Sequence, residues 1–256
     1  MIALSGKDLE YAKNIVDGIE ADLNYEYMDC EFWDNHVEEY LPLECGMASG
    51  VTKGVIIPCD KPFVIKIPLK CDSDNWMSTC THHSKWNSEL HTWEDVPASE
   101  YSYCDHSFCP QFEYAYNPID GTYGWNYCDA ELGYYTLAKE KGIEEFFAAT
   151  FYAGERKVDG VPIYLQEKIT TLYSRSDKEH TQEDLNSTSA FLDETKVYCP
   201  LELDFVCDLI QNYGAEKTKE FCDFLDEYNI SDLHRNNYGY RPDGTPCLID
   251  FSDFNG

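Results

Sequence analysis

The segment 229–251 constrains the fold of this chain more than any other part of the sequence. Two short strand-like runs, 238–240 and 246–249, flank Pro242-Asp243-Gly244, which is a turn signal. The turn folds the second strand back onto the first, so that position 240 faces position 246. Antiparallel partners lie about 5 Å apart at Cα. We therefore expect Asn237 and Asp250 to meet at the open end of this hairpin.

The side chains expected at this open end suit a hard cation. An amide oxygen from Asn237 and a carboxylate oxygen from Asp250 are ligand types that Mg2+ prefers. Asp232 lies just before them, in a loop that leaves a predicted helix. A carboxylate there can accept the proton of an incoming hydroxyl group. The segment thus predicts a metal site with a general base beside it.

This segment resembles the protein-kinase-like superfamily. Residues 232–237 are similar to its catalytic loop D-x-x-x-x-N, and residues 248–252 are similar to its metal-binding D-F-G element. The opening Asp-Leu-His is closer to the aminoglycoside- and choline-phosphotransferase branch and to small bacterial or phage kinases. The resemblance implies that Asp232 is the catalytic base, that Asn237 and Asp250 bind Mg2+, and that ATP is the phosphate donor.

Further elements follow the order of that superfamily. Val64-Ile65-Lys66-Ile67 is similar to V-A-I-K, which implies that Lys66 contacts the α- and β-phosphates. The stretch 46–54, with Gly46 and Gly50, stands in the place of the glycine-rich loop, although its spacing is not G-x-G-x-x-G.

The superfamily also implies a glutamate partner for the lysine and a segment that meets adenine. A helix predicted over 127–141 offers Glu131, and Glu140 and Glu89 are alternatives. The run 163–169 is similar to the fifth strand and the hinge. Its backbone groups near Glu167 to Ile169 are expected to meet adenine.

Hydrophobic periodicity predicts the remaining elements. A capping box at 5–8 opens a helix, strands are expected over 46–56, 62–67, 150–152 and 161–165, and helices over 203–212 and 215–228. The range 174–188 is polar and is expected to be a loop.

The composition shifts from strand-rich to helix-rich near residue 169. We therefore predict an α+β, two-lobed, kinase-like fold with a β-rich lobe over 1–168 and a reduced helical lobe over 169–256.

Residues 71–127 lack periodicity and are expected to form an irregular insertion rich in Cys, His, Trp and Tyr. Four of its Cys and His residues could bind Zn2+ tetrahedrally, although no C-x2-C pair is present and reduced thiols packed among aromatic residues are the simpler interpretation. The candidates are Cys71, Cys80, His82, His83, His91, Cys104, His106, Cys109 and Cys128.

Three departures from the superfamily pattern bear on function. Ile230 and Ser231 replace the histidine and arginine before the catalytic aspartate, so control by a phosphorylated activation loop is not expected. Ser252 replaces the glycine of D-F-G. The sequence ends at Gly256, without an A-P-E motif or a helical peptide-docking region, so the platform for a protein substrate must come from elsewhere or the acceptor is small.

The charge balance excludes some partners. The chain of 256 residues has 48 Asp and Glu against 19 Lys and Arg, a formal net charge of −29. Such a chain repels nucleic acid and anionic lipid, and a basic protein partner fits it better. No apolar run reaches the roughly 20 residues of a membrane span, and no signal peptide is apparent. A cytoplasmic protein with reduced thiols is expected.

The sequence therefore predicts an ATP- and Mg2+-dependent phosphotransferase that acts on a hydroxyl acceptor, either Ser or Thr of a protein or a small molecule. Two alternatives remain. One is a pseudokinase that binds nucleotide without transferring phosphate. The other is an acidic interaction module that mimics the charge of nucleic acid.

Overall fold

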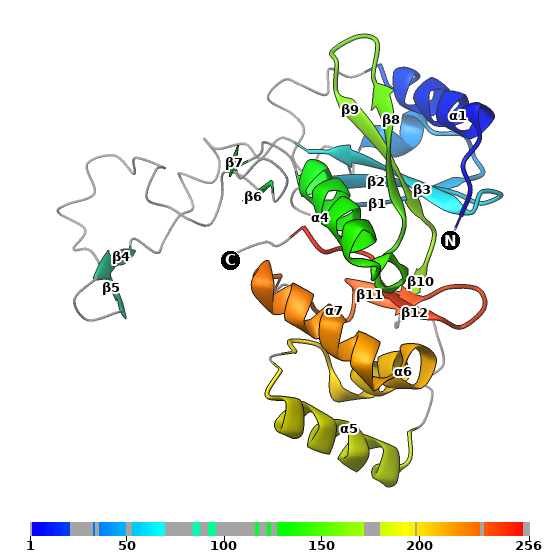
Figure 1. The fold of residues 1–256 in the computed structure, drawn as a ribbon. Coiled ribbons are helices and arrows are strands. Elements are labelled where there is room, and N and C mark those ends of the chain that lie inside the picture. The colour runs from blue at the N-terminus through cyan, green and yellow to red at the C-terminus, as the bar shows by residue number, and fades with distance from the viewer. Residues whose placement is uncertain are drawn as a thin grey trace.

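The computed structural model describes residues 2–20, 33, 36–49, 53–69, 127–171, 180–197, 199–230 and 233–252 with their side chains. It also describes the backbone of four short strands in the range predicted to be an irregular insertion. These form two hairpins, β4 (Ser84–Asn87) with β5 (Thr92–Asp95) and β6 (Tyr116–Asn117) with β7 (Thr122–Tyr123). The predicted α+β class is confirmed, because helices and antiparallel strands both contribute to the structure (Figure 1).

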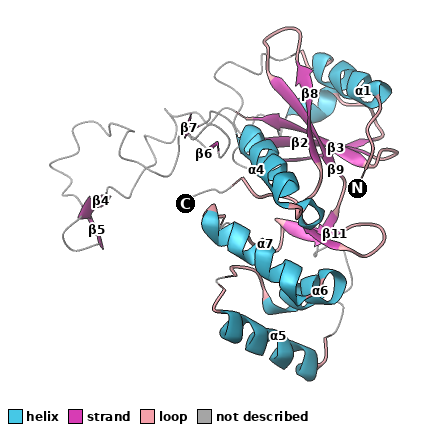
Figure 2. Ribbon diagram, viewed as in Figure 1, coloured by secondary structure: helices cyan, strands magenta, loops and turns pink. Residues whose placement is uncertain are grey.

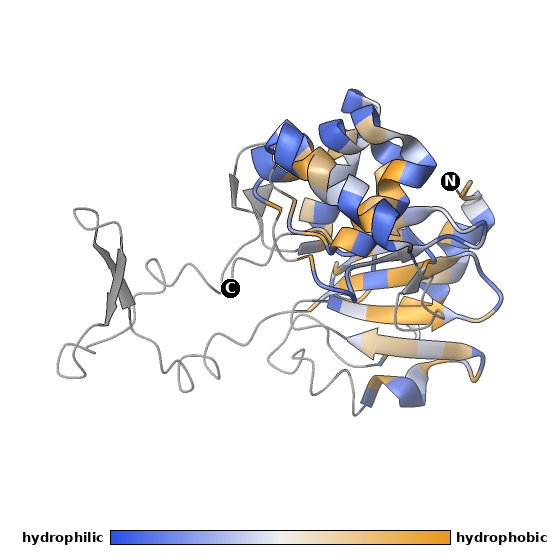
Figure 3. Cartoon of the chain, turned by 90° about the horizontal axis from the view of Figure 1, so that it is seen from below, coloured by the Kyte–Doolittle hydropathy of each residue, from blue (hydrophilic) through white to orange (hydrophobic). Residues whose placement is uncertain are grey.

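The main sheet has five strands in the order β1-β2-β3-β9-β8, and all neighbouring strands are antiparallel. The strands are β1 (Cys45–Ser49), β2 (Lys53–Pro58), β3 (Phe63–Pro68), β8 (Thr150–Glu155) and β9 (Pro162–Glu167). Figure 3 shows that apolar residues predominate on these strands, whereas the helices carry apolar and polar residues side by side.

Side chains of β3 alternate between the two faces of the main sheet, as the sequence predicts. Phe63, Ile65 and Ile67 are fully buried in a cluster with α1 (Gly6–Asp17), whose Ala12 and Val16 are also fully buried. The predicted capping box of α1 is present. Lys66 leaves the opposite face of β3, toward α4 (Tyr127–Lys141). Helices α1 and α4 therefore cover opposite faces of the sheet (Figure 1).

The remaining helices lie on the far side of α4 from α1 (Figure 2). They are α5 (Gln182–Thr195), α6 (Leu203–Tyr213) and α7 (Ala215–Glu227). Aromatic residues of α6 and α7, including Phe205, Phe221 and Phe224, share one buried cluster with Tyr134 of α4. Because α4 packs against both the sheet and these helices, apolar residues occur on several of its faces.

The expectation of a loop over 174–188 is wrong for its second half, where α5 begins. Thr181 caps this helix, since its side chain accepts a hydrogen bond from the Asp184 backbone and the capping box is complete. Thr188 is the only buried residue of α5. A helix that buries so few residues leaves almost no hydrophobic periodicity in the sequence, so its composition indicates a loop.

A small sheet lies between the main sheet and the helices, in the order β10-β11-β12. The chain leaves β9 at Glu167 and pairs again as β10 (Thr170–Thr171) with β11 (Tyr238–Tyr240), which pairs with β12 (Pro246–Leu248). The predicted register of the hairpin is confirmed, because Tyr240 faces Pro246. Gly239 is required here, since a Cβ at this position would lie 2.2 Å from the Thr170 carbonyl oxygen.

The hairpin is tied to the main sheet through the strand-like segment before β8. Phe147 and Leu248 form a parallel bridge, and the Ala148 amide donates to the Leu248 carbonyl at 2.7 Å. This connection holds the end of β12 close to β3 and β9. Among the residues that the structure describes, no helix is both long enough and apolar enough to cross a membrane.

Candidate functional site

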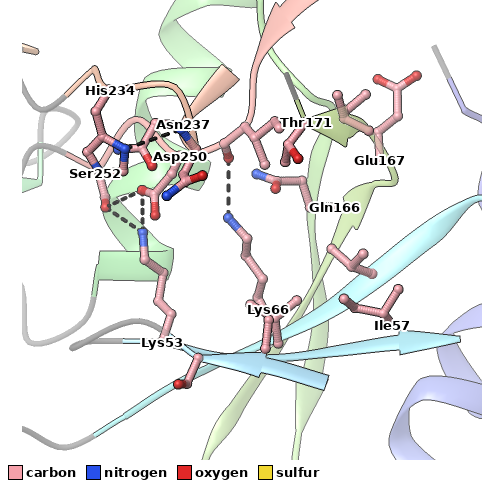
Figure 4. A pocket seen from close by; sticks show the side chains of 17 residues that line it. Lys53, Ile57, Lys66, Gln166, Glu167, Thr171, His234, Asn237, Asp250 and Ser252 are labelled. Carbon is pink, nitrogen blue, oxygen red and sulfur yellow. Dashed lines mark hydrogen bonds and ion pairs between the residues drawn. The ribbon is translucent and has the colours of Figure 1, made fainter. Parts of the chain in front are cut away.

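A cavity of about 570 Å³ opens between the main sheet and the small sheet. Its walls come from β1, β2, β3 and the end of β9 on one side, and from the loop before β11 and the segment after β12 on the other. Figure 4 shows Lys53 and Lys66 extending from the sheet toward Asn237, Asp250 and Ser252 on the opposite wall. The cavity therefore gathers side chains that lie almost two hundred positions apart in the sequence.

Lys66 pairs with Glu131, which reaches it from α4. Its Nζ lies 2.9 Å and 2.8 Å from the two carboxylate oxygens, and donates also to the Ile249 carbonyl at 3.2 Å. The Glu131 side chain is fully buried and that of Lys66 nearly so. Burial raises the pKa of the Glu131 carboxyl, and the neighbouring lysines oppose this shift. Of the alternatives, Glu140 is exposed to solvent and Glu89 lies outside the described residues.

Asn237 and Asp250 meet at the open end of the hairpin. The backbone amides of Ile249 and Asp250 donate to the Asn237 carbonyl at 2.7 Å and 3.2 Å, and both predicted metal ligands line the cavity. An amide oxygen and a carboxylate fit the donor preference of Mg2+. They are two residues, and no group of three or more His, Cys, Asp or Glu that could hold a metal occurs among the described residues. A cation here would complete its coordination with water and phosphate oxygens.

A second buried lysine, which the sequence reasoning missed, joins these two pairs. The Nζ of Lys53 lies 2.5 Å from Asp250 Oδ1, 2.7 Å from Glu131 Oε1 and 2.7 Å from Ser252 Oγ. Burial alone would lower the pKa of Lys53, but Asp250 and Glu131 outweigh burial and raise it. In turn burial would raise the pKa of Asp250, but Lys53 and Lys66 hold it well below its ordinary value. Asp250 is therefore ionised at neutral pH.

Strand alternation could have identified Lys53. Val55 of β2 pairs with Lys66 of β3, so Lys53, two positions before Val55, leaves the same face of the sheet. The intervening Gly54 faces the other way, where a Cβ would lie 2.6 Å from the Trp33 ring. Ser252, a departure from the superfamily pattern, also has a defined contact: its hydroxyl accepts from Lys53 and donates to Asp250 at 3.2 Å.

Gln166 places an unpaired acceptor at the cavity. Its Nε2 donates to Thr150 Oγ1 at 3.0 Å and to a Glu131 oxygen at 3.3 Å, which fixes the orientation of the amide. Its Oε1 is buried and has no hydrogen-bond partner in the described part of the chain. Buried polar atoms are nearly always paired. Because the Gln166 side chain is fully buried, a ligand donor would reach this oxygen only after the side chain turned toward the cavity.

Fewer backbone amides of the predicted hinge are available to bind a base than the sequence predicts. Glu167 and Ile169 line the cavity. The amides of Glu167 and Lys168 already donate to the carbonyls of Ala149 and Pro62, both at 2.9 Å. These two amides are therefore not available to a base. The Glu167 carboxylate is buried and pairs with Arg241 at 3.1 Å, so its side chain is committed to the fold.

Other predicted site residues are placed elsewhere. Gly46 lies within β1 opposite Ile57, three pairs from the Ser49–Gly54 pair that precedes the turn, and this strand lines the cavity through Ala48 and Ser49 instead. A Cβ at Gly46 would make only an ordinary contact, so no close approach requires glycine there. Gly50 and Asp232 lie outside the described residues.

The predicted zinc ligands lie outside the described residues, with one exception. Cys128 is buried in the first turn of α4, where burial and the nearby Glu131 raise the pKa of its thiol. A buried thiol with a raised pKa is a poor metal ligand.

Comparisons with known proteins give no further guide. No protein-family model, curated protein or solved structure matches the chain.

Proposed function

We propose that the protein is an ATP- and Mg2+-dependent phosphotransferase with a protein-kinase-like fold, which moves the γ-phosphoryl group to a hydroxyl acceptor. The observation that carries this proposal is the convergence of the Lys66–Glu131 pair and of Asn237 and Asp250 on one cavity. The resemblance assigns phosphate contact to the first pair and metal binding to the second. Residues so far apart in sequence have no other evident reason to meet around open space.

The arrangement of elements supports the same proposal. In the superfamily that the sequence resembles, the lysine lies on the third strand of an antiparallel sheet and its glutamate on the helix that follows. Here Lys66 lies on β3 and Glu131 on α4, which is the next α-helix among the described residues. The cavity lies between this sheet and the hairpin that ends in Asp250.

Phosphoryl transfer asks the protein mainly to position groups and to stabilise charge. Lys66 would bind phosphate oxygens, and Glu131 would hold its ammonium in place. Asn237 and Asp250 would hold Mg2+, which neutralises charge on the phosphate oxygens when bound. Asp232 would orient the acceptor hydroxyl and accept its proton, a role that the resemblance assigns.

The chemistry of the cavity also favours adenine as the base. A turn of the Gln166 side chain would bring its unpaired Oε1 within reach of an exocyclic amino group. Apolar contact for the ring comes from Val55, Ile57 and Val64 of the same cavity. A cavity of about 570 Å³ has the usual volume of a small-molecule site.

The test combines binding and turnover in the full chain. We expect Mg2+–ATP to raise the melting temperature, and labelled ATP to release ADP by slow transfer to water or to the protein itself. Lys66→Met should reduce both effects, and Asp232→Ala should reduce turnover while binding remains. Lys219→Met, which removes an exposed lysine of α7, is the matched control. Binding without turnover would favour the pseudokinase alternative, and absence of nucleotide binding would reject the proposal.

A further inference from the structure

The proposed mechanism assigns no role to the buried positive charge of Lys53. Only 5% of this residue is exposed, and its ammonium contacts three oxygens, on Glu131, Asp250 and Ser252. Burying an ammonium group is costly unless charged partners surround it. Lys66 already contacts both Glu131 oxygens, so pairing that carboxylate does not require a second lysine.

The ammonium of Lys53 binds the carboxylate assigned to the metal. It lies 2.5 Å from Asp250 Oδ1, and Ser252 also donates to this oxygen. Mg2+ binds carboxylate oxygens at about 2.0–2.1 Å, so a lysine ammonium and a metal ion compete for the same oxygen. Either the metal binds Asp250 through Oδ2 alone beside a fixed Lys53, or Lys53 moves when the metal takes Oδ1.

We propose that Lys53 is a second phosphate-binding lysine, which neutralises Asp250 before nucleotide binds and moves to the phosphate chain when Mg2+ takes its place. This inference rests on the proposed nucleotide site. Lys53 and Lys66 extend into the cavity from neighbouring strands, β2 and β3, toward the same region (Figure 4). The flexible four-carbon stem of lysine allows its ammonium to move between partners while the backbone stays in place.

Charge neutrality favours this exchange. In the structure two ammonium groups, on Lys53 and Lys66, balance two carboxylates, on Glu131 and Asp250. A nucleoside triphosphate adds up to four negative charges, and one Mg2+ offsets two of them. When the metal neutralises Asp250, the Lys53 charge becomes available to the phosphates. A site with a single lysine would leave more of the phosphate charge uncompensated in a poorly hydrated cavity.

The first experiment measures the metal alone. Mn2+ binding to the nucleotide-free protein is followed by electron paramagnetic resonance, and the Asp250-dependent site is identified as the signal lost in Asp250→Asn. We expect Lys53→Met to tighten this site about tenfold or more, because a charge-assisted contact no longer competes for Asp250. Lys66→Met removes the same charge from the same cluster without a contact to Asp250, and it should tighten the site much less.

The second experiment measures nucleotide affinity with Mg2+ and with EDTA, using the non-hydrolysable β,γ-imido analogue of ATP. In EDTA Lys53 stays on Asp250, whereas in Mg2+ the metal neutralises Asp250 and Lys53 contacts the phosphates. Lys53→Met should therefore lose about tenfold or more of its affinity in Mg2+ and less in EDTA, which makes its binding less metal-dependent than that of the wild type. Lys53→Arg keeps the charge and should restore most of the affinity in Mg2+.

The outcomes separate this inference from the proposed function. If the wild type binds no nucleotide, the proposed function fails and the inference fails with it. If the wild type binds nucleotide but Lys53→Met changes neither Mn2+ affinity nor metal dependence, the inference alone is overturned. Circular dichroism checks the fold of each variant. Should Lys53→Met not fold, Lys53→Gln, which removes the charge but keeps a hydrogen-bonding group, gives the same measurements.

Discussion

Two clusters of buried charge lie close to the cavity, and they differ in how completely their charged groups are fixed. The Arg241 cluster joins Arg241 to the Glu167 carboxylate at 3.1 Å, to the carbonyls of Glu145 and Phe147 at 2.9 Å and 2.8 Å, and to the Tyr213 hydroxyl at 3.3 Å. The donors of a rigid, planar guanidinium thus meet acceptors from several parts of the fold. This cluster holds the end of β9 against the hairpin.

The cavity cluster, formed by Lys53, Lys66, Glu131 and Asp250, is built from flexible ammonium groups that share carboxylates. Both lysines contact Glu131, and both line open space. Loss of one lysine leaves each carboxylate with another partner. Burial of charge is therefore common to both clusters, whereas shared partners beside a cavity occur only in the one to which we propose a function.

Breaking the Arg241 cluster should have the largest effect on stability. Arg241→Met leaves the buried Glu167 carboxylate without its charged partner, and we expect the free energy of unfolding to fall by about 3–5 kcal/mol. Urea denaturation measures it. Arg235→Met, which breaks the exposed pair with Glu202, is the control and should lower the stability far less than Arg241→Met. Equal losses in both variants would contradict a structural role for Arg241.

Breaking the cavity cluster should affect function more than stability. Lys66→Met leaves Glu131 paired with Lys53 at 2.7 Å, so we expect a loss of only about 1–2 kcal/mol in unfolding free energy. Phosphate transfer should fall about 100- to 1,000-fold, since a donor to the developing charge is removed. A loss of stability as large as that of Arg241→Met, with unchanged turnover, would show that the two clusters are equivalent.

The sequence predicts the parts of the site that follow from local geometry. The turn fixes the hairpin register and hence the approach of Asn237 to Asp250, and strand alternation directs Lys66 away from Ile65 and Ile67. These arguments need only a few consecutive residues. The pairing of Lys66 with Glu131 required the superfamily order in addition, and the helical face that Glu131 shares with Tyr134 and Ala138 favours it over Glu140.

The parts that the sequence did not predict depend on contacts between distant segments. Lys53 stands beside glycines in a turn-like stretch, and its burial arises from Glu131 and Asp250, far along the chain. Arg241 lies between a strand and the Pro242 turn, and no local pattern indicates its burial against Glu167. The helix α5 buries little and shows weak periodicity, although Thr181 and Asp184 form a capping box that is readable from the sequence.

Acid titration sharpens the comparison by isolating the Lys53–Asp250 pair. The depressed pKa of Asp250 stabilises the fold above its ordinary pKa of 3.8, and this contribution is lost as the pH falls through the lower pKa of the folded state. The pair has a partly exposed carboxylate, so we expect an effect of only about 1 kcal/mol. Lys53, whose pKa is raised, contributes fully below pH 10.5 and loses its contribution above it.

The measurement is urea denaturation of wild type and Asp250→Asn between pH 2.5 and 7. The difference between the two free energies should shrink as the pH falls below about 4 and should stay constant above it. Acidic residues outside the cavity cluster titrate alike in both proteins and cancel in this difference. A difference that changes near neutral pH instead would contradict a depressed pKa for Asp250.

A further prediction concerns the unpaired Gln166 oxygen, which belongs to neither cluster; the same amide contacts the cavity cluster through Glu131. If Gln166 Oε1 accepts a hydrogen bond from the adenine amino group, the wild type should bind ATP about tenfold more tightly than ITP, which has an oxo group at that position. Gln166→Leu should lower ATP affinity to that of ITP and leave ITP affinity nearly unchanged. Thr150→Val, which removes the hydroxyl that holds Gln166 Nε2 at 3.0 Å, should reduce the preference in part, because the amide is then free to turn. Equal affinity of the wild type for ATP and ITP would assign the unpaired oxygen to water instead of to the base, and would leave the cavity cluster as the source of nucleotide affinity.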